Sequence, residues 1–495
     1  MSTDKSIFKS ALMLIALAAG PAPAQGQLAP DAVADDPQLA VARGFLADMA
    51  SYLERGEEVG VGPLRERFGP AMAAELGEPQ VRLGLMQIGG EGPVRWELVD
   101  RRTVPPDPEQ GGEGEATEAF AAVLERGDAH WVVRLRVDPE GRLVGWRNSI
   151  GAPRRSRAEL ITALAELSGD WGFAAELYGP DGTLEERVSL SRGRRVFPLG
   201  SIFKLYVLAE LARQVTDGEL DLEQPVALRT ELKSLPSGIL QDRASGETAT
   251  VREMAELMIA ISDNTATDHL IELVGRRRIE EHLAEYGNSV PELNRPFLKT
   301  REMFIFKGAG SSRREAVLGT KSFKEAVGLW LEADRDQRLA WLEGLEGELA
   351  EYDEIKLRTR LVQGYAMTSL GPQHAEVEWF ARPGDLLELL RAAQEGRLVN
   401  PETSELFLEF YGHGTRHFPE VGALAGEVRG QGYKGGSETG IYALSSRVVL
   451  EDGRVVLACL LRSRFSPLDA QAPVQTSTLF NAWIRHLFEE APGPG

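Results

Sequence analysis

Residues 194–212 read RRVFPLGSIFKLYVLAELA and mark a change from strand to helix. The segment FPLG leads into LYVLAELA, whose apolar residues recur at helical spacing. We therefore expect Ser201 at the N-terminus of a helix, with Lys204 one turn later on the same face.

A hydroxyl and an amine held side by side suit covalent catalysis. A serine hydroxyl is a poor nucleophile without a base in reach, and a partly desolvated lysine can lose its charge and act as that base. The helix N-terminus also favours developing negative charge. The spacing alone is a weak signal, because the same SIFK string also occurs at residues 6–9.

That first copy lies in a segment typical of export. Lys5 and Lys9 precede the apolar stretch ALMLIALAAG, and Ala22-Pro23-Ala24 supplies the small residues of a cleavage site. We predict that residues 1–24 are a secretory signal peptide and that the protein is periplasmic or secreted, without stable membrane insertion. An uncleaved membrane anchor is the alternative.

The composition argues against several classes of partner. The 75 acidic residues outnumber the 55 basic ones, the net charge is −20, and no basic run could neutralise a nucleic acid backbone. The single cysteine, Cys459, permits no intrachain disulfide, and we expect it to be a buried strand thiol. His413 and His417 have no third ligand nearby, so we expect loop residues and neither a metal site nor a cofactor.

The length of 495 residues predicts two domains after the leader. We expect residues 25–150 to form a small α+β domain, with helices packed on a curved antiparallel sheet. The helices are predicted near 39–53 and 64–76, the second bent at Pro70, and the strands near 94–98 and 131–137.

Residues 155–490 form the second predicted domain. Ser156 and Glu159 indicate a capping box at a helix start, and WGFAAELY opens a hairpin. Near the end of the chain, two strands surround the turn Glu451-Asp452-Gly453 and a helix follows. We expect one antiparallel sheet built from both ends of this domain, with a helical subdomain inserted, so the fold class is α+β.

Two further stretches complete a set of motifs. Ser262-Asp263-Asn264 lies in a predicted helical segment, and Lys434-Gly435-Gly436 lies at the entry to the terminal strands. With Ser201 and Lys204, they resemble the S-x-x-K, S-D-N and K-T-G set of class A β-lactamases and penicillin-binding proteins. Each motif alone is compatible with a helix cap, a turn or a flexible loop, whereas chance rarely gives all three in this order.

The chain also resembles a two-domain family of class A-like serine hydrolases that includes a member from clavulanic acid gene clusters. The resemblance rests on the small N-terminal domain and on the segments PSGILQ, SDNTATDHLI and PELNRPFLKTREMF. Both resemblances imply a class A β-lactamase/transpeptidase-like fold for the second domain.

The resemblance implies a role for each matching residue. Ser201 would be the acylated nucleophile, Lys204 its proton partner and Ser262 the proton relay to the leaving nitrogen. The backbone amides of Ser201 and Ser437 match the positions of an oxyanion hole. The implied substrate-binding residues are Asn264, Lys434, Gly436 and Ser437.

One departure from the family concerns deacylation. In class A enzymes the first glutamate of E-P-E-L-N activates the water that cleaves the acyl-enzyme, and here Val290 replaces it. Glu292 and Asn294 are the candidates for handling that water, Asn294 with Lys204 as the base. A solvent-facing or structural role is the alternative for Glu292.

A second departure concerns the substrate carboxylate. Gly435 stands where the family carries a Thr or Ser whose hydroxyl holds this group. Ser437 offers a hydroxyl nearby. Arg447, Arg462 and Arg464 are candidate partners for the carboxylate, although a solvated surface position is the expectation for each.

A third departure is the length of the chain between Ser262 and Lys434, which indicates a helical insertion at about 301–380. We hypothesise a helical cap near the mouth of the site, and extra packing away from the site is the alternative. The expected apolar anchors are Phe323, Trp330, Leu331, Trp341 and Leu345.

These features predict an exported serine hydrolase that forms an acyl-enzyme on Ser201. The expected substrates are small β-lactam, ester or peptide-like molecules, and Val290 predicts slow deacylation of β-lactams. An active β-lactamase that uses another base is one alternative, and a non-catalytic binding or sensory protein is the other. The acyl acceptor and the oligomeric state stay open.

Overall fold

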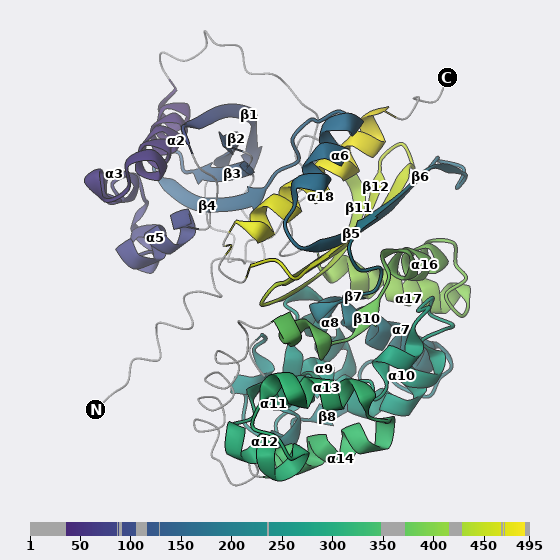
Figure 1. The fold of residues 1–495 in the computed structure, drawn as a ribbon. Coiled ribbons are helices and arrows are strands. Elements are labelled where there is room, and N and C mark those ends of the chain that lie inside the picture. Colours follow the sequence, from purple (N-terminus) through teal and green to yellow (C-terminus); the bar gives the residue numbers. More distant parts are fainter. Residues whose placement is uncertain are drawn as a thin grey trace. The chain divides into compact units, whose positions relative to one another are not determined.

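The computed structural model describes residues 36–86, 88, 92–104, 116–127, 129–234, 237–347, 372–414, 428–466, 469 and 471–490. These residues form two compact units (Figure 1). The first unit takes its described residues from 36–161 and 471–489, and the second from 162–469 and Glu490. The predicted signal peptide, residues 1–24, lies outside the described residues.

The first unit begins with four helices: α2 (Pro37–Arg55), α3 (Gly62–Arg65), α4 (Pro70–Glu75) and α5 (Glu78–Met86). The carboxylate of Asp36 caps α2 by accepting a hydrogen bond from Leu39 N at 3.0 Å. The prediction of one bent helix over 64–76 is wrong. Pro70 instead starts α4, because proline fits the first helical position, where its missing N–H costs no hydrogen bond.

An antiparallel sheet completes this α+β unit. Its strands lie in the order β1 (Val94–Val104), β2 (Thr117–Arg126), β3 (Ala129–Val137) and β4 (Leu143–Ile150). The sequence pattern predicts β1 and β3 but not β2 and β4. The helix α18 (Ala472–Glu490) belongs to the same unit, where Asn481 Nδ2 donates to Ile150 O at 3.1 Å and Arg485 Nη1 donates to Ala152 O at 2.8 Å.

The predicted capping box at residue 156 is confirmed. Glu159 Oε2 accepts a hydrogen bond from Ser156 N at 2.8 Å, directly ahead of α6 (Arg157–Glu166).

A five-stranded antiparallel sheet forms one layer of the second unit. Its strand order is β11 (Val428–Glu438), β12 (Ile441–Leu450), β13 (Val455–Ser463), β5 (Asp170–Tyr178) and β6 (Leu184–Arg192). The predicted sheet from two distant stretches of the chain is therefore confirmed, since β13 pairs with β5. Lys434, expected at the entry to the two terminal strands, lies inside a further strand ahead of them, the edge strand β11. Cys459 is buried in β13 as a free thiol, as predicted.

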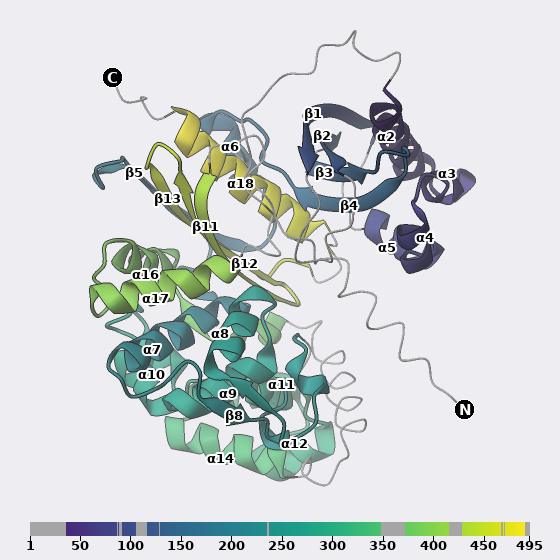
Figure 2. The ribbon, with the colours of Figure 1, turned by 180° about the vertical axis from the view of Figure 1, so that it is seen from behind.

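Helices form the other layer, and α16 and α17 lie side by side next to the sheet in both ribbon views (Figure 2). The helices are α7 (Lys204–Thr216), α8 (Val251–Ala260), α9 (Asn264–Val274), α10 (Arg276–His282), α11 (Thr300–Gly308), α12 (Ser311–Leu318), α13 (Phe323–Glu332), α14 (Arg335–Glu346), α16 (Pro383–Gln394) and α17 (Pro401–Gly412). Two short strand pairs join them, β7 (Phe197–Pro198) with β10 (Phe380–Ala381) and β8 (Pro225–Ala227) with β9 (Thr248–Thr250). The 3-10 turns of this unit are η4 (Gly200–Phe203), η5 (Thr230–Leu232), η6 (Leu240–Asp242), η7 (Pro291–Asn294) and η9 (Pro372–Glu376).

The described part of the predicted insertion consists of α11 to α14 and η9, and residues 348–371 lie outside the described residues. Trp330 and Leu345 are buried, and Phe323 and Trp341 are partly buried against the same core. The prediction that Leu331 is an apolar anchor is wrong, because its side chain is 53% exposed.

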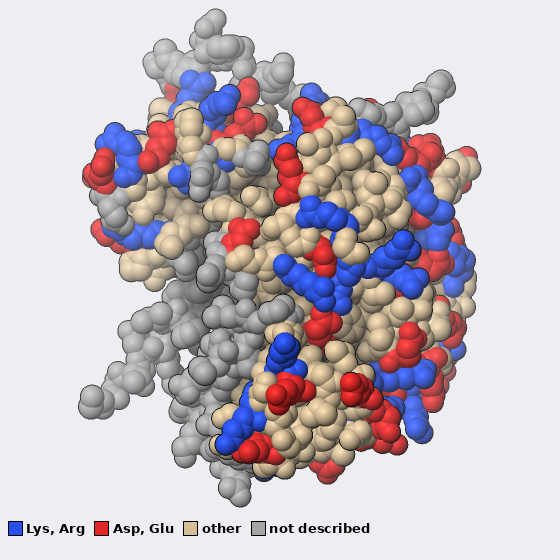
Figure 3. All heavy atoms as spheres, viewed as in Figure 1, with Lys and Arg blue, Asp and Glu red and all other residues tan. Residues whose placement is uncertain are grey.

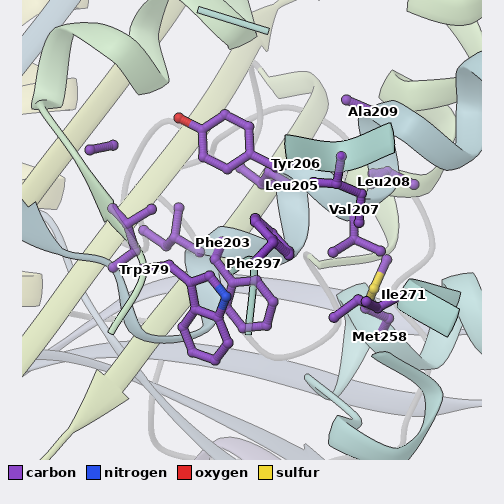
Figure 4. Packing of buried hydrophobic residues seen from close by; sticks show 14 of the residues in the cluster. Phe203, Leu205, Tyr206, Val207, Leu208, Ala209, Met258, Ile271, Phe297 and Trp379 are labelled. Carbon is purple, nitrogen blue, oxygen red and sulfur yellow. The ribbon is translucent and has the colours of Figure 1, made fainter. Parts of the chain in front are cut away.

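The core reaches the turn that carries Ser201. Phe203 stacks on Trp379 with ring centroids 3.5 Å apart and meets Phe297 edge-on at 5.8 Å (Figure 4). Such aromatic pairs add to the free energy gained by burial. The backbone around Ser201 is thus fixed by packing on two sides.

The described surface carries both signs of charge. On the face drawn in Figure 3, Lys and Arg side chains lie among Asp and Glu side chains. In the described part of the chain, we find no helix that combines the length and the apolar character needed to cross a membrane.

Candidate active site

Ser201 lies in the 3-10 turn η4, which runs directly into α7. Gly200 has φ +48°, a conformation that favours glycine. Ser201 is half-buried, and its hydroxyl forms no hydrogen bond with any residue that the structure describes. The hydroxyl is therefore available to an incoming group.

Lys204, the first residue of α7, is completely buried. Its Nζ donates to Ser262 O at 2.6 Å, to Ser262 Oγ at 3.0 Å and to Asn264 Oδ1 at 2.7 Å. Burial lowers the pKa of Lys204 to about 7, against the opposing pull of the Asp263 and Asp268 carboxylates. A large fraction of this amine is consequently neutral near neutral pH.

Ser262 lies between α8 and α9, where the predicted helical segment is in fact interrupted. Its φ of 58° is unusual for a residue other than glycine. Ser237 Oγ donates to Ser262 O at 2.6 Å. Asp263 caps α9 through Ala266 N at 2.8 Å and accepts a second bond from Ile239 N at 2.7 Å. These bonds hold the strained backbone and aim the Ser262 hydroxyl.

Lys434 reaches the same hydroxyl from β11. Its Nζ donates to Ser262 Oγ at 3.0 Å and to Gly435 O at 2.9 Å, and the residue is 3% exposed. Burial, followed by the charge of Lys204, lowers the pKa of Lys434 well below 10.5. Two lysines with weakened basicity therefore share one hydroxyl, an arrangement that suits proton transfer along Lys204, Ser262 and Lys434.

Gly436 lets β11 approach the Ser201 turn. A Cβ atom added there would lie 2.2 Å from Leu199 O and 2.6 Å from Ser201 N, so no side chain fits. A Cβ atom added to Gly200 would lie 3.1 Å from Ser437 N. The backbone amides of Ser201 and Ser437 are thus neighbours, as two donors to one oxyanion must be.

The PELN turn, which consists of Val290 and the 3-10 turn η7, contains no buried charged group. Val290 is buried, and Glu292 is exposed with no hydrogen bond or ion pair to the described residues. Asn294 is buried, with Oδ1 accepting from Phe380 N at 2.7 Å and Nδ2 donating to Phe380 O at 3.0 Å. Both ends of this amide thus attach η7 to β10, which in turn pairs with β7 just ahead of Ser201.

The three candidate arginines form hydrogen bonds with residues outside the S-x-x-K, S-D-N and Lys434-Gly435-Gly436 motifs. Arg447 donates to Gln394 Oε1, Arg462 to Ser168 Oγ and Arg464 to Glu376 Oε1. The expectation of a surface position is wrong for Arg462, which is 1% exposed.

A buried cluster of four charged or titratable groups adjoins the Ser201 turn, and the sequence did not predict it. Lys307 Nζ pairs with Glu378 Oε1 and lies 3.4 Å from Glu438 Oε2, which is 2.9 Å from His374 Nε2. Burial raises the pKa of Glu378, while the Lys307 ammonium opposes this and the backbone amide of Gly200 contributes a smaller opposing hydrogen bond. The only sequence signal is an acidic residue inside the apolar run VEWF.

No group of three or more His, Cys, Asp or Glu side chains able to hold a metal ion occurs within the described ranges. His413 ends α17, and His417 lies outside those ranges.

Comparison with known proteins gives a match for the part of the chain that carries Ser201, Lys204 and the Ser262 motif. Residues 161–335 match the Beta-lactamase enzyme family. Over 111 residues the chain is 30% identical to β-lactamase AER-1 of Aeromonas hydrophila, an alignment that covers 21% of this chain and 36% of that protein. The chain therefore spans well under half the length of this curated relative.

Solved structures are similar as well. A β-lactamase from Sphaerobacter thermophilus is 21% identical with a TM-score of 0.44, over 68% of this chain and 100% of that one. The protein PBP-A is 17% identical with a TM-score of 0.41, over 67% of this chain and 98% of that one. Residues 161–335, which carry the S-x-x-K and S-D-N residues, are therefore similar to the Beta-lactamase enzyme family.

Proposed function

We propose that this protein is an exported serine hydrolase that becomes acylated on Ser201 by β-lactam, ester or peptide-like substrates and releases β-lactam acyl groups slowly. The observation that carries the proposal is the convergence of Lys204 and Lys434 on Ser262 Oγ, each at 3.0 Å, in the unit that presents Ser201. A protein that only binds a ligand has no need for two buried lysines on one hydroxyl.

Acylation begins with attack of Ser201 Oγ on the substrate carbonyl carbon. The neutral amine of Lys204 takes the hydroxyl proton, which its lowered pKa permits near neutral pH. Lys204 and Ser201 share no hydrogen bond in the free protein, but catalytic hydrogen bonds often form only with substrate bound. The carbonyl oxygen becomes an oxyanion and accepts hydrogen bonds from the amides of Ser201 and Ser437.

Collapse of the tetrahedral intermediate breaks the bond to the leaving group. For a β-lactam, the ring nitrogen leaves and takes a proton from Ser262 Oγ, which is replenished from Lys204 or Lys434. The products of this step are an ester on Ser201 and a protonated leaving nitrogen. Asn264 remains on the Lys204 side of the network, where its amide can also contact the substrate.

Deacylation lacks a positioned base in the PELN turn, because the Glu292 carboxylate is exposed and forms no hydrogen bond or ion pair with the described residues. A buried valine cannot accept a proton from water, and Asn294 uses both ends of its amide on Phe380. General-base assistance typically contributes about 10²–10⁴-fold to a rate, so its loss makes the acyl-enzyme long-lived.

Intact-mass measurement on the mature protein tests the proposal. A panel of penicillins, cephalosporins and activated esters should give a stable adduct that maps to Ser201 and is absent from Ser201→Ala. Fast turnover of penicillins without an accumulating adduct would support a β-lactamase with another base. Absence of any Ser201-dependent adduct or turnover would support a binding or sensory protein instead.

A further inference from the structure

The side chain of Tyr433 fills the space beside Gly435. Both residues lie in β11 and face the same side of the sheet, because strand side chains alternate. A Cβ atom added to Gly435 would lie 2.1 Å from Tyr433 Oη and 2.9 Å from its Cζ. The phenol hydroxyl therefore occupies the place where a Thr or Ser side chain at position 435 would stand.

This position borders the reacting groups. The carbonyl of Gly435 accepts a hydrogen bond from Lys434 Nζ at 2.9 Å, and the next residue, Gly436, lies against Ser201 N. In the described sheet β11 is an edge strand, so its outer edge can face a ligand. A substrate that reaches Ser201 along this edge passes Gly435.

The phenol also has the right chemistry for a hydrogen-bond donor. Burial raises the pKa of Tyr433 well above 10, so the hydroxyl keeps its proton at neutral pH. Tyr433 as a whole residue is half-buried. Burial lowers the pKa of the neighbouring Lys434, which disfavours its charged form. A neutral hydrogen-bond donor beside it therefore adds a second way for this strand to hold an anionic group.

We propose that Tyr433 determines substrate specificity: its Oη donates a hydrogen bond to the substrate carboxylate next to the scissile carbonyl, replacing the hydroxyl that Gly435 lacks. This inference rests on the proposed acylation of Ser201. It predicts that the preferred acyl donors carry a carboxylate close to the amide or ester bond that is broken.

The test compares benzylpenicillin with its methyl ester, which differ in the charge on that carboxylate. The measured quantity is the second-order rate constant for adduct formation on Ser201. Tyr433→Phe keeps the ring and removes the hydroxyl, and it should lower the rate for benzylpenicillin about 10- to 100-fold, the range for a hydrogen bond to a charged group. The rate for the methyl ester should change much less.

A matched control is Tyr178→Phe. The Tyr178 hydroxyl donates to Glu176 Oε2 at 2.6 Å in β5, so this variant also loses a tyrosine hydrogen bond. It should leave the ratio of the two rates unchanged. A fall in that ratio only in Tyr433→Phe assigns the effect to the position beside Gly435 and not to general loosening of the sheet.

A reciprocal exchange tests the hydroxyl itself. Tyr433→Ala should lose the preference for benzylpenicillin, and the double variant Tyr433→Ala with Gly435→Thr should recover it, because the threonine hydroxyl then fills the vacated place. Failure of the double variant to recover, with a folded protein by circular dichroism, would contradict the assignment of the effect to a hydroxyl.

Two outcomes separate this inference from the proposed function. If wild-type protein forms the Ser201 adduct but Ser437→Ala, and not Tyr433→Phe, loses the preference, then Ser437 holds the carboxylate and the inference is wrong. If wild-type protein forms no adduct with either compound or with activated esters, both the proposed acylation and the role of Tyr433 are overturned.

Discussion

Two regions connect to the turn that carries Ser201. The Ser262 network, formed by Ser262, Lys204 and Lys434, consists of polar groups that can exchange protons, and the PELN turn does not. In the first, two buried lysines and a strained serine meet within 3.0 Å. In the second, an apolar Val290 and a fully bonded Asn294 secure η7 to β10. The Ser262 network has groups that can transfer protons, whereas the PELN turn has a side chain that binds the backbone of β10. The proposed function rests on this contrast, with the first region assigned to acylation and the second offering no positioned base for deacylation.

The largest effect should follow loss of the Lys204 amine. Lys204→Met should slow adduct formation about 10²–10⁴-fold, the range for a general base. Lys204→Arg should be nearly as slow, since a guanidinium does not give up its proton at working pH. Rates come from mass spectra taken during reaction with a penicillin. Lys299→Met, which removes a surface ion pair with Glu272, should leave the rate unchanged.

If Lys204→Met forms the adduct at the wild-type rate, the Ser262 network does not differ from the PELN turn in catalytic role. That result would show that the buried amines hold structure and that another group activates Ser201.

The second prediction restores a base to the PELN turn. Val290→Glu should speed release of the penicillin adduct about 10²-fold, the low end of what a general base supplies. Val290→Gln is the matched control, because it has a similar size and cannot accept the proton. Both variants bury a polar group and should lose stability alike. Equal release rates for the two variants would mean that the missing carboxylate is not what limits deacylation.

The third prediction concerns pH. Burial lowers the pKa of Lys204 to about 7, and only the neutral amine takes a proton. Adduct formation should therefore rise about tenfold per pH unit below pH 7 and level off above it. The same shift means that the unfolded chain binds more protons between about pH 7 and 10.5, so the Lys204 contribution to stability should rise with pH across that window. A rate independent of pH from 5 to 8 would contradict Lys204 as the base.

The sequence was sufficient to predict the sheet, the Ser156 cap and the similarity of residues 161–335 to the Beta-lactamase enzyme family, because these depend on local periodicity and on short motifs. It was insufficient where a long-range partner decides the outcome. Asn294 is a candidate for handling a water in the sequence, but both ends of its amide bond to Phe380, at the far end of the predicted insertion. Arg462 is expected at the surface, but it is buried and donates a hydrogen bond to Ser168 Oγ, 294 residues earlier in the chain. The hydroxyl missing at Gly435 is replaced by Tyr433, two residues away on the same strand face, a contact that no motif encodes.

The fourth prediction treats Asn294 as a structural residue. Asn294→Ala leaves the backbone N–H and C=O of Phe380 without their side-chain partners, which should cost about 1–3 kcal/mol of unfolding free energy. Chemical denaturation measures this loss. Release of the penicillin adduct should change little at a temperature where the variant stays folded. A marked slowing of release without loss of stability would instead assign Asn294 to the deacylating water.

The smallest effect should come from Glu292, the one carboxylate of the PELN turn. Its side chain is exposed and forms no hydrogen bond or ion pair with the described residues, so nothing orients it toward Ser201. Glu292→Gln should change adduct formation, adduct release and stability by less than about twofold or 0.5 kcal/mol, as for other surface substitutions. Val290→Glu adds a carboxylate at position 290, and Glu292→Gln removes one at position 292. Comparison of the two variants therefore shows which position requires the base. Faster release in the first with no change in the second places the requirement at position 290, and loss of turnover in Glu292→Gln would show that an exposed carboxylate already does this work.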